Sequence, residues 1–299
     1  MMRKLGMVFV FFWSVRILNG AQPEPVLAID HATAWGRIYG PLFALYADGT
    51  VVVRKGWKAG ERQDATAIAS YVTFRVPDGR EFCRALFPYN PKALKAHYEL
   101  TSATDQDETS IWISGHVTRI YGERNMPARW ADLDQQTLEQ EREKQASLPN
   151  GLRRLLEKIE ELSSRADGAS WCPPSCDISF VGYDYAPGVT TPWPAKWRIS
   201  GFHPPADGRL AAESVSFPGT DIQELLAFTD GLPERGAIGI EGHKVAVGTI
   251  FIRFPKDIIW MRAIRDSRRA YEQGLYPSLY TPGMTPKRWR ELRRLLGAG

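Results

Sequence analysis

Two β-rich stretches with Asp-Gly turns constrain how the first half of this chain folds. LFALYADGTVVVRK, residues 42–55, has Asp48 and Gly49 at its centre, and Asp-Gly between apolar runs is a strong signal for a β-hairpin. YVTFRVPDGREFCRALF, residues 71–87, has Pro77-Asp78-Gly79 near its middle, which predicts a second hairpin by the same reasoning. This half of the chain is therefore expected to fold mainly as sheet.

The rest of the chain alternates between strand and helix patterns. DLDQQTLEQEREKQA, within residues 131–165, is polar nearly all round, which is typical of a solvated helix or connector. It is followed by leucine and isoleucine at helical spacing, which predicts one packed face: Leu152, Leu155, Leu156, Ile159 and Leu162. Strands are predicted at 108–122, 177–185 and 243–254, and helices at 91–100, 221–228, 258–273 and from 285 onward.

These patterns predict an α+β fold of twisted antiparallel β-sheets, with packed helices and a polar helical middle segment. The corresponding division is a signal peptide, a β-rich N-terminal half, a helical connector, an α+β C-terminal half and a basic amphipathic C-terminal helix. The signal peptide comprises residues 1–21, and the β-rich half comprises residues 22–130. The connector spans residues 131–166, the α+β half residues 167–284 and the C-terminal helix residues 285–299. Whether the two halves form one domain or two stays open.

The N-terminus has the layout of a secretory signal peptide. A basic MMRK start precedes LGMVFVFFWSV, an apolar run at residues 5–15, and Ala21 is a suitable last residue before cleavage. The run is shorter than the roughly 20 residues needed to span a bilayer. The sequence therefore predicts export to the periplasm or the extracellular medium.

Charge is unevenly distributed along the mature chain. The net charge of +4 falls to +1 once Arg3, Lys4 and Arg16 are removed with the signal peptide. Residues 253–299 hold 11 basic and 4 acidic residues. The acidic body and basic C-terminal end that result are compatible with a partner surface.

Cys172 and Cys176 flank Pro-Pro-Ser. Their spacing differs from that of a redox dithiol, and a zinc site would need further ligands. In an exported protein a disulfide is the usual fate of paired cysteines, so a small 172–176 staple is expected. A bridge from Cys83 to either one, or no bridge at all, are the alternatives. So short a loop would shape a turn more than stabilise the fold.

Four aromatic residues lie close together in the second half, namely Tyr183, Tyr185, Trp193 and Trp197. If exposed, they would form a platform for a sugar or peptide ligand. The alternative, which the sequence favours, is that they fill the core beside a rigid, proline-bounded loop.

Catalytic motifs are not evident. The five histidines match no metal-ligand spacing, and there is no GxSxG, SxxK or phosphate-binding loop. We therefore expect neither a cofactor nor a metal, and lean against an enzyme. The alternative is a hydrolase whose site is assembled from distant residues, such as His116 or His203 with nearby carboxylates.

The segment TPKRWRELRRLL, residues 285–296, predicts an amphipathic helix with an apolar side. Lys287, Arg290 and Arg294 lie opposite that side. The helix would dock on its own domain, bind an anionic membrane or contact nucleic acid, and export argues against nucleic acid.

Several short segments resemble a family of exported bacterial proteins that has no assigned function. The segments are LYADGTVVVR, WISGHVTRIYG, WCPPSCDISFVGYDYAPG and TPWPAKW, within residues 42–260. The resemblance implies an exported α+β fold and carries no functional residues. Together with the residue patterns, it leads us to expect a non-catalytic binding or envelope-associated protein, with the hydrolase and a peripheral membrane protein as alternatives.

Overall fold

A computed structural model of the chain describes residues 23–32, 38–58, 68–101, 106–122, 135–165, 168–182, 190–199, 202, 213–232 and 237–272. The signal peptide and the 285–296 helix predicted from the sequence lie outside these residues.

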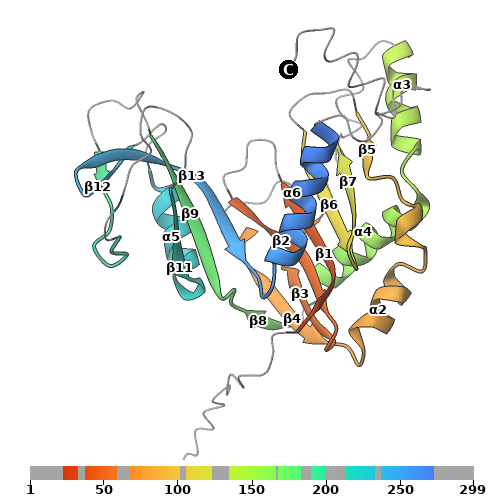
Figure 1. The fold of residues 1–299 in the computed structure, drawn as a ribbon, viewed down its shortest axis with the longest axis horizontal. Coiled ribbons are helices and arrows are strands. Elements are labelled where there is room, and N and C mark those ends of the chain that lie inside the picture. The colour runs from red at the N-terminus through yellow and green to blue at the C-terminus, as the bar shows by residue number, and fades with distance from the viewer. Residues whose placement is uncertain are drawn as a thin grey trace, which may run out of the picture.

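Eight strands form a curved sheet, sheet A, on one side of the molecule (Figure 1). Their spatial order is β8-β4-β3-β2-β1-β6-β7-β5. The strands are β1 (Pro25–Ala32), β2 (Ile38–Tyr46), β3 (Thr50–Arg54), β4 (Tyr71–Arg75), β5 (His97–Glu99), β6 (Glu108–Ile113), β7 (His116–Tyr121) and β8 (Ala169–Trp171).

A second group of strands, sheet B, extends from sheet A to the other side of the molecule (Figure 1). The strands are β9 (Ser175–Gly182), β10 (Thr190–Pro192), β11 (Glu213–Pro218), β12 (Ala237–Ile240) and β13 (His243–Arg253). The first half of β13 pairs with β12, and its second half pairs with β2 through Ile250 and Phe251. The long strand β13 therefore joins the two sheets.

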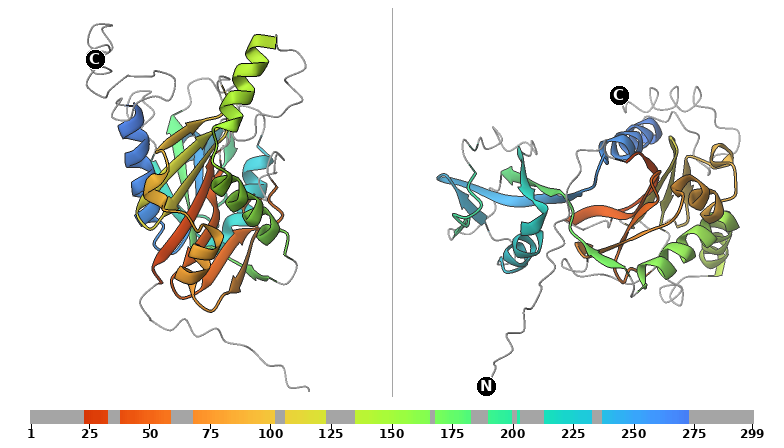
Figure 2. Two further views of the ribbon diagram at one scale, coloured as in Figure 1. Left: turned by 90° about the vertical axis from the view of Figure 1, so that its right-hand side faces the viewer. Right: turned by 90° about the horizontal axis from the view of Figure 1, so that it is seen from below.

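Helices cover both faces of sheet A and one face of sheet B. The helices are α2 (Gly79–Leu86), α3 (Gln135–Ala146), α4 (Asn150–Ser163), α5 (Ile222–Asp230) and α6 (Ile258–Glu272), with short 3₁₀ turns at Pro91–Ala93 and Gly219–Asp221. Helices α2 and α4 pack on one face of sheet A, whereas α6 packs on the opposite face (Figure 2). Helix α5 packs on sheet B.

The fold is α+β, as the sequence predicted, but the sheet is mixed rather than purely antiparallel. Parallel pairs are formed by β13 with β2, by β5 with β7 and by β10 with β12. The pattern of a single strand does not reveal its partner, and these partners are far apart in the chain, so local patterns were insufficient to predict the pairing direction.

The hairpin at Asp48-Gly49 is confirmed. Strands β2 and β3 pair across it, and Gly49 has a φ of +83°, which a residue with a side chain adopts only with strain. Asp48 stabilises the turn, because its carboxylate accepts hydrogen bonds from the backbone N–H and hydroxyl of Thr50, both at 3.0 Å.

The second predicted hairpin is wrong. Residues 71–75 form β4, but Asp78 is the N-cap of α2, and its carboxylate accepts a hydrogen bond from the Glu81 N–H at 2.9 Å. An aspartate that precedes a glycine serves a helix start as well as it serves a turn, and here the following residues pack as a helix.

Two further predictions need correction. Residues 91–100 form a 3₁₀ turn and strand β5 instead of one helix. Residues 108–122 form two strands, β6 and β7, that pair around Ser114 and Gly115, both at positive φ.

The predicted helix face of α4 is confirmed, because its leucines and isoleucine are all buried.

Candidate functional site

Four polar residues lie next to one another across sheet A and form what we call the polar row: Asp30, Ser110, Arg119 and His97. Asp30 of β1 is opposite Ser110 of β6, Ser110 is opposite Arg119 of β7, and Arg119 is opposite His97 of β5. Cross-strand neighbours on one face are close enough for their side chains to interact. The strand register therefore assembles this row from four separate strands.

Helix α6 covers the polar row. Trp260 and Ile264 are buried, and Arg268 and Tyr271 continue the same side of the helix at three- to four-residue spacing. The covering side is thus apolar at the start of the helix and polar toward its end. This change matches the sheet below, where Trp260 interacts with Asp30 and Tyr271 stacks near His97.

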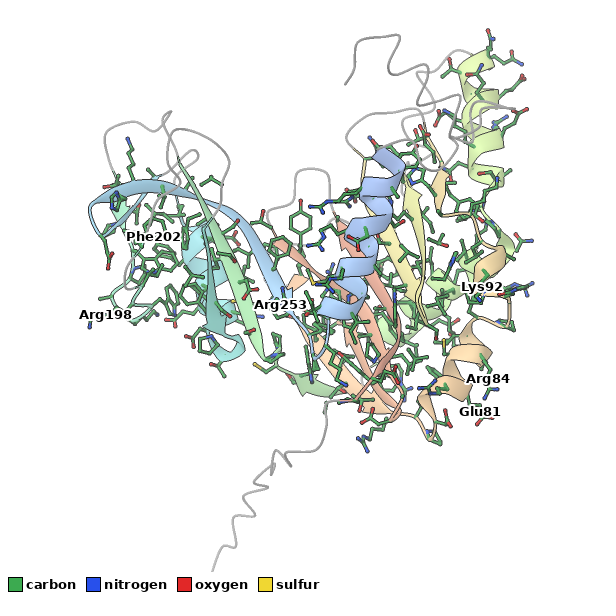
Figure 3. All side chains as sticks on the ribbon, viewed as in Figure 1. Glu81, Arg84, Lys92, Arg198, Phe202 and Arg253 are labelled. Atoms are coloured by element: carbon green, nitrogen blue, oxygen red, sulfur yellow. The ribbon has the colours of Figure 1, made fainter. Side chains whose placement is uncertain are left out.

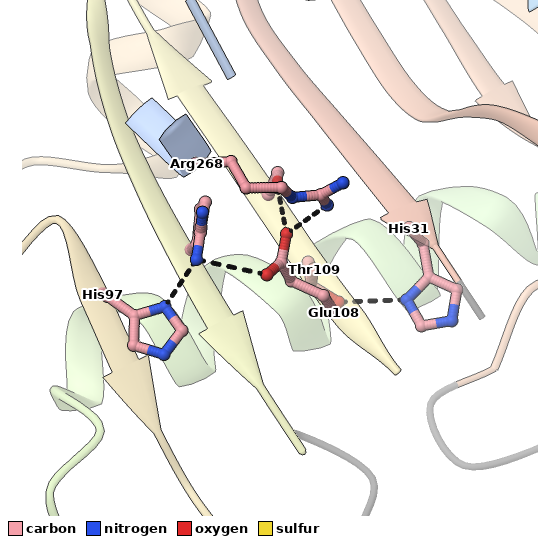
Figure 4. A network of polar contacts seen from close by, with 7 residues as sticks. His31, His97, Glu108, Thr109 and Arg268 are labelled. Atoms are coloured by element: carbon pink, nitrogen blue, oxygen red, sulfur yellow. Dashed lines mark hydrogen bonds and ion pairs between the residues drawn. The ribbon is translucent and has the colours of Figure 1, made fainter. Parts of the chain in front are cut away.

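Glu108, at the start of β6, connects the polar row with α6 (Figure 4). Its Oε1 accepts a hydrogen bond from Arg268 Nη2 at 2.7 Å, and its Oε2 lies 3.4 Å from Arg119 Nη2. Arg119 is only 3% exposed. A guanidinium this deeply buried needs charged and hydrogen-bonding neighbours, so Glu108 is the main counterion of a buried cation.

His97 is held in its neutral form. Its Nδ1 lies 3.2 Å from Arg119 Nη2, which can only donate, so Nδ1 acts as the acceptor. Burial and, to a lesser extent, the Arg119 charge lower the pKa of His97 to about 4, whereas Glu108 opposes the shift. The Tyr271 ring covers the imidazole, with the ring centroids 4.2 Å apart. His97 therefore carries no charge near neutral pH.

Asp30 lies at the other end of the row, where the two sheets meet, and we call its surroundings the Asp30 junction: Asp30, Arg54, Tyr71, Trp260 and Asp257. Asp30 retains partial exposure, but desolvation of its carboxyl raises its pKa to about 7. The Asp257 charge raises the pKa as well, whereas Arg54 and the Trp260 indole lower it. A carboxyl that titrates near neutral pH marks a candidate functional position.

The junction contains buried polar atoms that lack hydrogen-bond partners within the part of the chain that the structure describes. Arg54 donates from Nη2 to Gly40 O at 2.7 Å, but its Nε has no partner. Burial raises the pKa of Tyr71, and the nearby Arg54 guanidinium lowers it through its charge and a hydrogen-bonding interaction. The geometry of that interaction is poor, and among the described residues the Tyr71 hydroxyl has no well-aligned partner. A methyl group at Gly40 would lie 2.7 Å from that hydroxyl, so only glycine fits there.

The turn between β13 and α6 anchors the junction to sheet B. The Asp257 carboxylate accepts hydrogen bonds from Arg253 Nη2 at 2.9 Å and from the Phe254 N–H at 3.0 Å. Arg253 Nη1 also lies 3.3 Å from Asp177 Oδ2 of β9. Figure 3 shows Arg253 between the two parts of the molecule. This arrangement fixes the start of α6 over Asp30.

On the opposite face of sheet A, His31 lies between a carboxylate and a hydroxyl. Its Nδ1 is 3.0 Å from Thr109 Oγ1, and its Nε2 is 3.3 Å from Asp107 Oδ2. A hydroxyl, an imidazole and a carboxylate in line are the parts of a nucleophilic triad. However, Thr109 is fully buried, so its hydroxyl is not accessible to a substrate. In this structure, the three side chains connect β1 to the start of β6.

Of the predicted aromatic platform, the structure describes Trp193 and Trp197, while Tyr183 and Tyr185 lie outside the described residues. Trp197 is 5% exposed, and Trp193 is partly buried against the same core. Trp193 Nε1 donates to Trp197 O at 2.6 Å. The Trp193 ring packs against aromatic rings of sheet B and α5, namely Phe180, Phe217 and Phe228.

The predicted 172–176 staple is not present, because all three cysteines are free thiols. Cys176 of β9 is fully buried in the core of sheet B, whereas Cys172 is exposed before the strand begins. The chain extends through Pro173 and Pro174 into β9, and this extension directs the two thiols to different environments. Cys83 is buried in α2, on the other side of sheet A.

The other predicted site residues are not brought into the polar row. His116 is partly buried at the start of β7, where burial lowers its pKa. His203, Lys287, Arg290 and Arg294 lie outside the described residues. Within the described ranges, no group of three or more histidine, cysteine or acidic side chains is arranged to hold a metal ion.

Sequence reasoning missed Asp30, Glu108 and Arg119. The sequence could have indicated Asp30, because it is an acidic residue within the mainly apolar strand PVLAIDHA. Buried charged residues are rare without a specific partner, so such a residue predicts a structural or functional role. No comparable signal identified its neighbours, because these depend on strand register.

Comparison with known proteins gave no further information: no family model, no curated protein and no solved structure matches this chain. Among the helices that the structure describes, none combines the length and the apolar character needed to cross a membrane.

Proposed function

We propose that this chain is an exported, non-catalytic binding protein that holds a small hydrogen-bonding ligand at the Asp30 junction. Export rests on the signal-peptide pattern of residues 1–21. The observation that carries the binding role is a set of buried polar atoms around Asp30 without a hydrogen-bond partner in good geometry among the described residues, Arg54 Nε and the Tyr71 hydroxyl above all.

The energetics of burial support a ligand at this position. Each buried polar atom without a hydrogen bond costs about 1–3 kcal/mol, and Arg54 and Tyr71 are each 3% exposed. A bound molecule that accepts from Arg54 and Tyr71 would remove that cost. The partial exposure of Asp30 is compatible with access from solvent.

The position of the junction supports the same proposal. Small-molecule sites occur preferentially where two structural units meet, and the junction lies where β13 joins sheet A to sheet B. The pKa of Asp30, near 7, leaves its carboxyl able to donate or accept a hydrogen bond at neutral pH. The ligand would therefore carry both donors and acceptors.

Native mass spectrometry of the protein purified from its own envelope fraction tests this proposal. We expect the native mass to exceed the denatured mass by that of a small ligand. Tyr71→Phe removes one hydroxyl and should weaken the affinity for the ligand about fivefold, because one hydrogen bond contributes roughly 1 kcal/mol. Ligand occupancy should fall accordingly when the site is not saturated. Tyr98→Phe is the matched control, since the Tyr98 hydroxyl accepts a hydrogen bond from the Lys95 N–H far from the junction.

Equal native and denatured masses would overturn the proposal, and so would a ligand that Tyr71→Phe and Tyr98→Phe retain equally well. If the native and denatured masses are equal, ordered water molecules would account for the hydrogen bonding of the buried polar atoms at the junction.

A second candidate function, a hydrolase, is favoured by one observation, the line from Asp107 through His31 to Thr109. The burial of Thr109 weighs against it. The test is turnover of a panel of esters and glycosides by the purified protein. Activity that His31→Asn and Thr109→Val both abolish would establish the hydrolase and contradict a purely binding role.

A further inference from the structure

The start of α6 exposes two adjacent isoleucines. Ile258 is 57% exposed and Ile259 is 42% exposed, and in the part of the chain that the structure describes the only other large hydrophobic residue this exposed is Tyr89. Exposed apolar side chains grouped in one place mark contact surfaces more often than isolated ones do. These two lie at one end of a helix on the outside of the molecule (Figure 1).

A row of arginines continues from these isoleucines along the outer side of α6. Ile258, Arg262, Arg265 and Arg269 are spaced by four, three and four residues, which places them in one stripe along a helix. All four are exposed. We call this stripe, together with Ile259, the basic outer face.

The opposite side of α6 is fixed to the protein. Trp260 is fully buried and Ile264 is 8% exposed, and Arg268 is bound to Glu108. The helix is therefore already folded and oriented, and its basic outer face points away from sheet A. Two acidic residues of α6 lie near the stripe in helical position: Asp266, whose Oδ1 lies 3.6 Å from Arg265 Nε, and Glu272, which follows Arg269 by three residues. Against three arginines, positive charge remains in excess.

We propose that the basic outer face docks the protein on the surface of an anionic lipid bilayer. Charge complementarity selects a negatively charged partner, because each basic side chain close to an anionic membrane contributes attraction. The isoleucines distinguish a bilayer from a soluble polyanion, since apolar side chains enter the boundary between headgroups and acyl chains. The binding surface is presented by a helix fixed to the fold, and it is independent of the Asp30 junction.

Vesicle flotation with the mature protein tests this docking. The probes are vesicles of phosphatidylcholine alone and vesicles of phosphatidylcholine mixed equally with phosphatidylglycerol. The variants are Arg262→Glu/Arg265→Glu/Arg269→Glu, called the face variant, and Ile258→Asn/Ile259→Asn, called the isoleucine variant. The charge control is Arg84→Glu/Lys92→Glu/Arg154→Glu, which changes net charge equally on the far side of sheet A, where Figure 3 shows Arg84 and Lys92.

We expect the wild type to float with anionic vesicles and not with neutral ones, and high salt to release it. The face variant should bind anionic vesicles at least about 100-fold more weakly, since each of its three arginines contributes roughly fivefold. The isoleucine variant should bind several-fold more weakly, and the charge control should bind to within about twofold of the wild type, since its substitutions lie away from the docking face.

Two results would overturn the proposal. One is a face variant that floats as the wild type does. The other is binding of soluble polyglutamate as tight as vesicle binding, lost in the face variant and unchanged in the isoleucine variant, which would assign the surface to an acidic polypeptide. Retained circular dichroism of each variant establishes that the losses do not come from unfolding.

Discussion

The two faces of sheet A are built on different principles. Beneath α4 the packing is apolar, with Leu152, Leu155 and Ile159 fully buried against strand residues. Beneath α6 the sheet carries the polar row. The side of α6 that lies over this row contains Trp260, Arg268 and Tyr271 rather than a continuous apolar stripe. The same sheet therefore carries one face whose helix packing is mainly apolar, with the His31–Asp107 pair as a local exception, and one face on which a row of polar and titratable side chains lies beneath a helix.

This difference indicates where function is to be sought. Apolar burial is favourable without further conditions, whereas a buried charge stabilises little net and is costly once its partner is removed. The face that carries Asp30, Glu108 and Arg119 beneath a helix contributes less to the free energy of unfolding than an apolar face would. Groups retained at such a cost are the ones most expected to serve binding.

The largest expected effect comes from breaking the ion pair on the polar face. Glu108→Leu leaves the guanidinium of Arg119, which is 3% exposed, without its main counterion. We expect the free energy of unfolding to fall by about 3–5 kcal/mol. Urea denaturation, with the midpoint and slope compared between wild type and variant, measures this.

The double variant Glu108→Leu/Arg119→Met provides the control, because it removes both charges and keeps volume. It should recover most of the loss. A double variant less stable than Glu108→Leu would show that the cost comes from packing and not from the uncompensated charge.

A somewhat smaller effect is expected on the apolar face. Leu155→Ala in α4 leaves a cavity where the side chain is fully buried, and the cost should be about 3 kcal/mol. Glu157→Ala, exposed on the same helix, should change stability by less than about 0.5 kcal/mol. If Leu155→Ala costs as little as Glu157→Ala in urea denaturation, the apolar face does not stabilise the fold as argued.

The pH dependence of stability gives the smallest effect and separates two groups of the polar row. Burial raises the pKa of Asp30 to about 7, so the folded protein keeps this proton while the unfolded chain loses it. The free energy of unfolding therefore falls as the pH rises from about 4 to 7, on the order of 2 kcal/mol after allowance for partial exposure. His97 acts in the opposite direction. Its folded pKa of about 4 lies below the usual 6.5, so stability is lost as the pH falls from about 6.5 to 4.

Substitutions separate these two slopes. Burial also raises the pKa values of Asp257 and Glu99, so the comparison is made with the wild type. Asp30→Asn should make stability rise more steeply, or fall less steeply, with pH than in the wild type, whereas His97→Gln should have the opposite effect. Urea denaturation at a series of pH values tests both. Identical pH profiles of the two variants would contradict the assignment of either group.

Much of the secondary structure was readable from the sequence, whereas the site was not. The Asp48-Gly49 hairpin, the apolar side of α4 and the extent of α6 follow from turn chemistry and periodicity, which act over a few residues. The turn at Asp78 was misread because an Asp-Gly pair is compatible with both a hairpin and a helix start, and only the packing of α2 on sheet A decides between them.

By itself, the sequence determined the α+β class, the hairpin at Asp48-Gly49 and the apolar side of α4, because each depends on neighbouring residues. The tertiary structure alone decided the mixed sheet and the polar row. Asp30, Ser110, Arg119 and His97 come from four strands, and only the register of those strands places them side by side. Register is fixed by the joint packing of both faces of the sheet, and that information is distributed over the whole chain.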